Sequence, residues 1–157
     1  MKKVIIGLVL TLSVVIVGAI YLYQSAHAPY AQAEDETITF LAERTDLDQV
    51  EDFYWYNGEV TTFTVRGFNE AEEEKLYMVQ PEGGAIVTFD AAEIVTEQEA
   101  RRVTREAREP KRILNAKVGL MNDTPIWEVT YKNENDRLGY YIIHLKTGEW
   151  LRTIDNI

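Results

Sequence analysis

An uninterrupted apolar run near the N-terminus constrains this chain more than any other feature. Val4 to Tyr23 reads VIIGLVLTLSVVIVGAIYLY, 20 residues with no charge and no proline. At about 1.5 Å per residue, a helix of this length spans the roughly 30 Å hydrocarbon core of a bilayer. In lipid a single segment satisfies its backbone polar groups only as a helix, so the run predicts a transmembrane anchor.

The charges that flank this run predict its orientation. Lys2 and Lys3 precede it, and the next basic residue lies far downstream. Basic residues favour the cytoplasmic side of a membrane. We therefore expect residues 1–3 to form a cytoplasmic tail, residues 4–23 to form a single-pass anchor, and the C-terminal part to be extracytoplasmic.

A cleaved signal peptide is the alternative interpretation. Ala26-His27-Ala28 has the small-x-small pattern of a cleavage site. The apolar run is longer than the usual signal core of about 7–15 residues, however. Cleavage after Ala28 would also place Pro29 first, where its ring hinders the protease. An uncleaved anchor is therefore favoured, and on either interpretation the remainder works outside the cytoplasm.

The charge of the exported part excludes one class of partner. All 26 acidic residues of the 157 follow residue 33, and the whole chain has a net charge of −10. An acidic domain does not bind the phosphate backbone of nucleic acid, which requires a basic surface. Because the chain has no cysteine, its fold must be held by core packing without disulfides.

Residues 34–94 predict a first module of one helix followed by four strands. Residues 24–33 form a juxtamembrane linker that either precedes this helix, Glu34 to Asp46, or merges into it. Asn57-Gly58 between two alternating segments predicts a type I′ hairpin. The expected strands are Val50–Tyr56, Glu59–Gly67, Leu76–Gln80 and Ala85–Asp90.

Residues 95–157 predict a second module with the same order of elements. Thr96-Glu97-Gln98-Glu99 is a capping-box pattern that begins a helix, and Pro110 ends it. The expected strands are Ile113–Met121, Ile126–Lys132, Leu138–Leu145 and Glu149–Ile154. The sequence thus predicts an α+β fold with two tandem modules, each a helix on a four-stranded antiparallel sheet. Because neither buries much core alone, we expect the modules to pack against each other.

The exported part lacks the usual catalytic residues. Serine occurs only at Ser13 and Ser25, cysteine is absent, and the two histidines, His27 and His144, are far apart. We therefore expect no Ser or Cys nucleophile, no clustered zinc ligands and no cofactor. His144 is expected to be a half-exposed strand residue. A carboxylate-based glycosidase is the enzymatic alternative, although the dense glutamates of residues 70–74 are typical of a solvated connection.

Four arginines on the expected second helix form a candidate interaction surface. Arg101, Arg105, Arg108 and Arg112 recur at helical spacing and share one face, opposite Ala100, Val103 and Ala107. Such a stripe suits an anionic polymer, lipid headgroups or an acidic protein. The alternative is a solvated face balanced by neighbouring glutamates.

The aromatic run Phe53-Tyr54-Trp55-Tyr56 is the second candidate surface. In a strand Phe53 and Trp55 share one face, whereas Tyr54 and Tyr56 share the other. Exposed aromatic residues are good interface anchors, so Tyr54 and Tyr56 are candidate docking residues. The alternative is that they are buried between the two modules.

The second module resembles a PepSY-type module. The resemblance rests on Trp127-Glu128-Val129-Thr130-Tyr131, on Gly139–Leu145 and on Thr147-Gly148-Glu149-Trp150-Leu151. With the N-terminal anchor and the first module, the whole chain resembles the YpmB/TseB-like cell wall elongation regulator family of Firmicutes. This resemblance implies two tandem cystatin-like units and supplies no catalytic motif.

The same resemblance implies a non-enzymatic role at the cell membrane. It implies binding to a penicillin-binding transpeptidase of the elongation machinery and an effect on lateral peptidoglycan synthesis and cell shape. PepSY modules also suggest an alternative, a protease inhibitor or chaperone-like module at the cell surface. The expected partners are a membrane protein and, through the N-terminal helix, the lipid bilayer.

Overall fold

The computed structural model describes residues 2–157, with side chains from residue 11 onward except those of residues 24 and 26. Met1 and the side chain of Val4 lie outside this description. The chain forms two compact units, Met1–Glu36 and Thr37–Ile157. Each unit is described by itself below.

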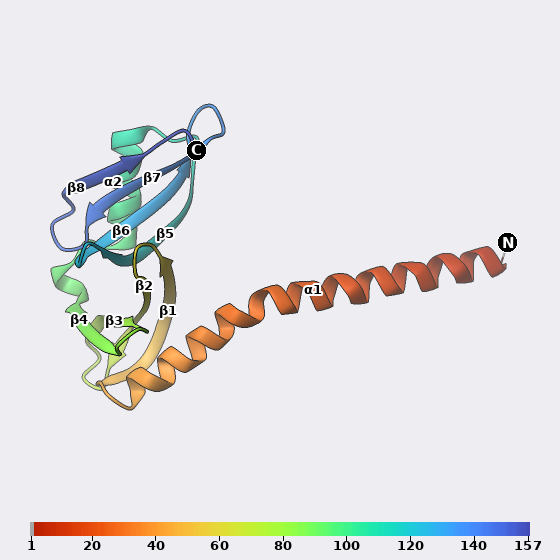
Figure 1. Cartoon of the computed structure of the whole chain (residues 1–157), viewed down its shortest axis with the longest axis horizontal. Coiled ribbons are helices and arrows are strands. Elements are labelled where there is room, and N and C mark those ends of the chain that lie inside the picture. The colour runs from red at the N-terminus through yellow and green to blue at the C-terminus, as the bar shows by residue number, and fades with distance from the viewer. Residues whose placement is uncertain (1) are drawn as a thin grey trace. The chain divides into compact units, whose positions relative to one another are not determined.

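The N-terminal helix α1 runs from Lys2 to Ala42 and includes the whole expected anchor (Figure 1). The expected linker, residues 24–33, is not a separate segment, because its alanine-rich sequence continues the helix through Pro29. The described apolar side chains of the anchor are exposed, as at Tyr23. A helix that presents large apolar side chains all round suits lipid.

The helix ends four residues before the expected Asp46. Thr45 donates both its backbone N–H and its hydroxyl to the Leu41 carbonyl, each at 2.8 Å. The Thr45 hydroxyl therefore shares the Leu41 carbonyl with the backbone N–H of the same residue. This side-chain hydrogen bond closes the last turn of the helix. Leu41 itself is fully buried.

The first sheet, here called sheet A, is an antiparallel meander in the order β1-β2-β3-β4. Its strands closely follow the predicted ones. They are β1 (Leu47–Asn57), β2 (Thr61–Asn69), β3 (Glu74–Gln80) and β4 (Ala85–Asp90).

The type I′ turn predicted at Asn57-Gly58 is wrong. Asn57 pairs with Thr61, so the connection has three residues, and neither Asn57 nor Gly58 has a positive φ. Glycine at position 58 instead allows the ring of Tyr56 to lie close to the backbone, because a Cβ at Gly58 would overlap that ring.

The second sheet, here called sheet B, follows a short 3₁₀ turn, η1 (Ala91–Glu93), and the helix α2 (Glu97–Arg108). The predicted cap is confirmed, since Thr96 accepts the Glu99 N–H at 3.2 Å. Glu109, in the left-handed conformation, closes the helix before Pro110. Sheet B has the order β5-β6-β7-β8, with strands β5 (Arg112–Met121), β6 (Thr124–Lys132), β7 (Leu138–His144) and β8 (Trp150–Ile154).

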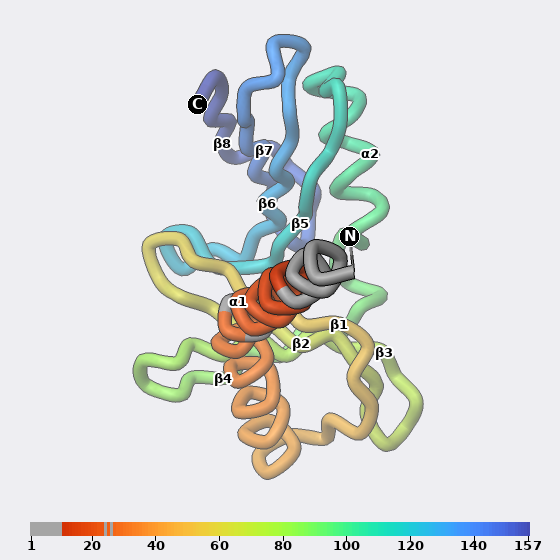
Figure 2. Tube along the Cα trace, turned by 90° about the vertical axis from the view of Figure 1, so that its right-hand side faces the viewer, coloured from red at the N-terminus to blue at the C-terminus, as the bar shows by residue number. Residues whose placement is uncertain are grey.

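The predicted α+β fold of two helix-and-sheet modules is therefore confirmed. The helix α2 packs against β5 and β6 on one face of sheet B (Figure 2). Ala100 and Thr104 are its buried residues, whereas the predicted Ala107 is exposed. Thr104 can be buried because its hydroxyl donates to the Ala100 carbonyl at 2.8 Å.

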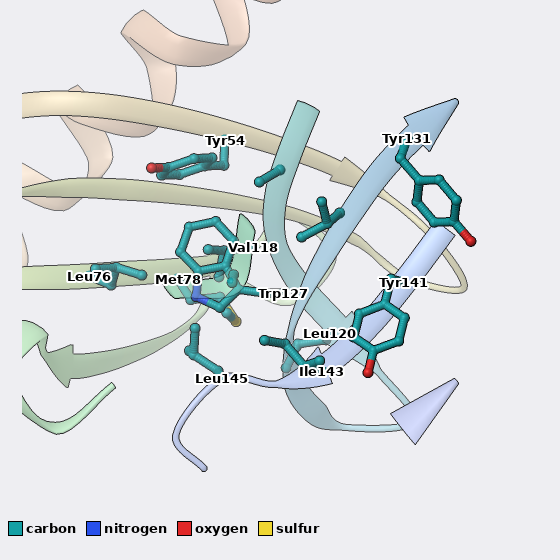
Figure 3. Packing of buried hydrophobic residues seen from close by; sticks show 13 residues of the cluster. Tyr54, Leu76, Met78, Val118, Leu120, Trp127, Tyr131, Tyr141, Ile143 and Leu145 are labelled. Atoms are coloured by element: carbon teal, nitrogen blue, oxygen red, sulfur yellow. The ribbon is translucent and has the colours of Figure 1, made fainter. Parts of the chain in front are cut away.

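One hydrophobic core joins the two modules, as expected. Trp127 is 2 % exposed and makes an edge-to-face contact with Tyr54 of sheet A, with ring centroids 5.6 Å apart (Figure 3). Its indole N–H donates to the Val95 carbonyl at 2.7 Å. The same core takes Leu76 and Met78 from sheet A and, from α2 and sheet B, Ala100, Ala116, Val118, Leu120, Val129, Tyr131, Tyr141, Ile143 and Leu145.

Tyr54 and Tyr56 hold strand β5 between them. Tyr54 packs in the core beside Trp127, whereas Tyr56 packs with Ile126 and Ile142. The ring of Tyr56 lies directly over Gly119, where any Cβ would overlap it. Ile126 and Trp127 are successive residues of β6 and point to opposite faces, so the two tyrosines contact opposite faces of sheet B at its β5 edge.

We predict that Trp127→Ala lowers the free energy of unfolding by about 3–5 kcal/mol, because it leaves a cavity in the shared core. Chemical denaturation of the full chain in detergent, followed by circular dichroism, measures the change. Trp150→Ala is the matched control, because Trp150 lies in the same sheet and is 60 % exposed. An unchanged unfolding midpoint for Trp127→Ala would contradict the role given to this residue.

Candidate interaction surfaces

The four predicted arginines differ in how they are engaged. Arg101 donates from Nε to Glu97 Oε1 at 2.7 Å. Arg108 donates from Nε to the Tyr131 hydroxyl at 3.0 Å and forms an ion pair with Asp155. These two arginines therefore tie α2 to its own fold and do not form an open surface.

Arg105 and Arg112 remain available for a partner, but only Arg105 lies on α2: the helix ends at Arg108, and Arg112 begins strand β5, so the predicted placement of Arg112 on the helical stripe is wrong. Both are exposed, and within the described residues neither side chain makes an ion pair or a hydrogen bond. Arg102, on another side of the helix, is held between Glu99 and Glu106. Neighbouring glutamates therefore neutralise only part of the predicted stripe, and positive charge is left at Arg105 and Arg112.

The predicted docking role of Tyr54 and Tyr56 does not agree with their burial. They are 8 % and 6 % exposed, respectively, and lie between the modules. The alternative interpretation of the aromatic run is thus the one that the structure supports. The reason is that the edge of sheet B inserts against this face of sheet A, which the alternation of the strand alone does not reveal.

A polar network lies beside the core where β1 meets the start of α2. The Tyr54 hydroxyl donates to Glu97 Oε2 at 3.1 Å, while the other oxygen of Glu97 accepts from Arg101. Burial, together with the negative charge of Glu97, raises the pKa of Tyr54. Glu97 therefore links sheet A to α2 through one carboxylate, and this contact was missed in the sequence.

A second network fastens the segment after α1 to sheet A, and we call it the helix-end network. Asp46 Oδ1 accepts from the Tyr77 hydroxyl at 2.9 Å. Its Oδ2 accepts from Asn69 Nδ2 and Lys75 Nζ, each at 3.0 Å. Asn69 in turn accepts the backbone N–H groups of Ala71 and Glu73, which shapes the β2–β3 turn.

The network holds the Asp46 carboxylate ionised. Hydrogen bonds from Asn69, Lys75 and Tyr77 lower the pKa of Asp46 from 3.8 to about 2. The charged form is favoured because all three partners donate to it. The sequence predicts Asp46 only as a helix boundary, since its convergence with Asn69 and Tyr77 depends on the pairing of distant strands.

The contacts of His144 and of the half-buried Glu128 bear on the question of catalysis. His144 ends β7, and its Nδ1 accepts the N–H groups of Lys146 and Thr147 at 3.1 and 3.3 Å, so it orders a turn. Burial raises the pKa of Glu128, but its cross-strand neighbours are Lys117 and Ile142 and not a second carboxylate. In the described part of the chain, no group of three or more His, Cys, Asp or Glu residues is placed to hold a metal ion.

These features define a class of protein. It is an α+β protein with tandem helix-and-sheet modules and with one described helix long and apolar enough to cross a membrane. Residues 36–79 match the model of the cell wall elongation regulator TseB-like domain. The fold is similar to that of the YpmB protein from Bacillus subtilis, with a TM-score of 0.65 and 19 % identity over 72 % of this chain and 89 % of that chain.

Together the family match and the structural match support the YpmB/TseB-like family, in agreement with the resemblance seen in the sequence. A search of curated proteins finds no match. The family match and the apolar helix suggest a membrane-anchored protein with a role in cell wall regulation. The matched residues 36–79 contain the four side chains that converge in the helix-end network: Asp46, Asn69, Lys75 and Tyr77.

We predict that Asp46→Asn destabilises the protein at pH 7 by about 1 kcal/mol, a small value because solvent screens a half-exposed carboxylate. The native pKa lies below the unfolded value, so this contribution is complete above pH 3.8 and is lost as the pH falls toward about 2. Thermal unfolding of both proteins between pH 7 and 2 should therefore show melting temperatures that converge in acid.

The matched control for this prediction is Asp48→Asn. Asp48 is exposed and lies outside the helix-end network, so the same change of charge should leave the melting temperature almost unaltered. An equal loss of stability in both variants would contradict the assignment to Asp46.

Proposed function

We propose that this protein is a membrane-anchored, extracytoplasmic regulator of peptidoglycan synthesis and cell elongation that acts by binding and not by catalysis. The observation that carries the proposal is the match of residues 36–79 to the TseB-like domain. The apolar helix α1 supports it, since a wall-synthesis regulator at the membrane surface needs an anchor.

The proposed topology follows the charges around the anchor. Lys2 and Lys3 support a cytoplasmic location for residues 1–3, with the proposed modules of residues 34–94 and 95–157 outside the membrane. The absence of cysteine and of any serine beyond Ser25 supports a non-enzymatic role. The surroundings of Glu128 agree, because a glycosidase needs a pair of carboxylates.

The proposed partner is a penicillin-binding transpeptidase of the elongation machinery. The resemblance to the YpmB/TseB-like family supports this choice. Confinement to the same membrane raises the effective concentration of both proteins, so a modest interface is sufficient. An acidic patch of the partner is proposed to meet Arg105 and Arg112, whose charges are exposed and unpaired in the described part of the chain.

In-cell crosslinking of the full-length protein, followed by affinity purification, tests the partner. We expect a penicillin-binding transpeptidase above abundance-matched membrane proteins. Arg105→Glu together with Arg112→Glu should reduce its recovery by about tenfold, because charge reversal repels an acidic surface. The paired control, Arg152→Glu in β8 with Arg137→Glu in the turn before β7, makes the same change of charge away from Arg105 and Arg112 and should retain recovery.

Other outcomes of the crosslinking experiment are equally informative. Recovery of an extracellular protease instead of a transpeptidase would replace the proposal with the inhibitor alternative. Equal recovery with all variants would reject the surface on α2 but keep the partner. Recovery of neither class would reject the proposed function.

We predict that the anchor contributes proximity in addition to export. A secreted form that lacks residues 1–23 and carries a cleavable signal peptide should fail to restore cell shape in a deletion strain, because the effective concentration is lost. Replacement of the same residues by an unrelated single-pass helix is the control and should restore it. Light microscopy of cell width and length measures both, and full rescue by the secreted form would contradict the prediction.

A further inference from the structure

The edge strands of the two sheets differ in how they are protected. Strands β1, β5 and β8 each have an irregular register with their neighbour and carry charged side chains, as do many natural edge strands. Register breaks and charges discourage the pairing of an exposed edge with another chain. Three of the four edges are thus unsuited to accept a further strand.

Strand β4 has no register break, and its only charged residue is the last one, Asp90. It pairs with β3 in unbroken register from Lys75↔Asp90 to Gln80↔Ala85. Its first five residues, Ala-Ile-Val-Thr-Phe, are uncharged, contain no proline and are mostly β-branched or aromatic. Val87 is 43 % exposed at its centre. Within the described residues, β4 is the last strand of sheet A and has no strand on its outer side.

The ends of this edge are acidic. Glu82 is exposed in the β3–β4 turn, and Asp90 and Glu93 are exposed at the other end. Lys146 forms one ion pair there, with Glu93 at 3.7 Å. The edge therefore presents a row of backbone groups beside apolar side chains, with carboxylates at both ends.

We propose that the β4 edge binds an extended segment of another protein as an added strand. The backbone groups of an open edge are matched by an extended peptide, and alternate side chains of that peptide contact the two faces of the sheet. The acidic ends favour a segment with apolar or β-branched residues in the middle and lysine or arginine at each end. This proposal is independent of the transpeptidase assignment, because it specifies the chemistry of the bound segment and not its source.

A second copy of this chain fits the edge less well. In antiparallel pairing centred between Val87 and Thr88, the end of β4 beside Glu82 in one copy would approach the end beside Asp90 and Glu93 in the other. In parallel pairing each acidic residue would meet its own equivalent. Directly opposed like charges destabilise paired strands, so both arrangements are unfavourable.

A synthetic peptide tests the proposal. The probe is acetyl-Lys-Lys-Val-Thr-Val-Thr-Val-Lys-Lys-amide, added to the full-length protein in nanodiscs of zwitterionic lipid, with binding followed by isothermal titration calorimetry. We expect saturable binding below about 1 mM and slower amide hydrogen exchange in Ala85–Asp90. Two matched peptides should bind at least about tenfold more weakly: one with glutamate in place of each lysine, and one N-methylated at alternate residues.

Variants of the protein locate the site. Val87→Lys adds the charge that protects other edges and should weaken binding by at least about tenfold. Val50→Lys is the matched control, because Val50 is 37 % exposed and lies on the protected strand β1. Thr88→Lys, on the opposite face of β4, is a second exposed test position if Val87→Lys lowers the melting temperature.

Several results would overturn the proposal. They are no binding of the lysine-flanked peptide at about 1 mM, equal binding to the Val87→Lys and Val50→Lys proteins, or slower exchange in β1 or β8 instead of β4. Self-association that Val87→Lys abolishes would identify a second copy as the occupant in place of a basic segment.

Discussion

The shared core between the two sheets is the interaction on which the rest of the structure depends. Each module supplies one helix and one four-stranded sheet, which is too little to bury a stable core alone. Tyr54 and Trp127 contact each other at the centre, and Tyr56 closes over Gly119 on the other side of β5. The modules are therefore one folding unit in energetic terms, although the chain order presents them as two.

This use of the aromatic run determines which surfaces are left for partners. Because Tyr54 and Tyr56 are buried, the open features of the described chain are the unpaired arginines beside α2 and the unprotected edge of β4. The two surfaces have opposite chemistry. Arg105 and Arg112 suit an acidic patch, whereas the acidic ends of β4 suit a basic extended segment. The helix-end network adds a fixed connection between the segment after α1 and sheet A, through Asp46 and Tyr77.

Most of the fold could be predicted because its signals are local. Thr96 caps α2 by accepting a backbone N–H only three residues away, from Glu99. Strands are identified in a similarly local way, because alternating residues reveal a strand before its partner is known. The turn at Asn57-Gly58 was mispredicted because the glycine makes room for the Tyr56 ring, which is a side-chain constraint and not a backbone one. The end of α1 was misplaced because the Thr45 hydroxyl competes for the Leu41 carbonyl. The helix-end network gave no signal at all, since Asp46, Asn69 and Tyr77 come together only after three strands pair.

The sequence by itself determined the apolar helix, the order of elements, the acidic charge and the absence of cysteine and of any serine beyond Ser25, because these depend on composition and on neighbours within a few residues. Only the tertiary structure decided which side chains face a partner. Arg101 and Arg108 are similar to Arg105 in spacing and charge, yet they are tied to Glu97 and Asp155. Tyr54 alternates as an exposed strand residue would, yet it is buried. The reason is that burial and pairing depend on which distant elements arrive at the same place, and no local pattern encodes that contact.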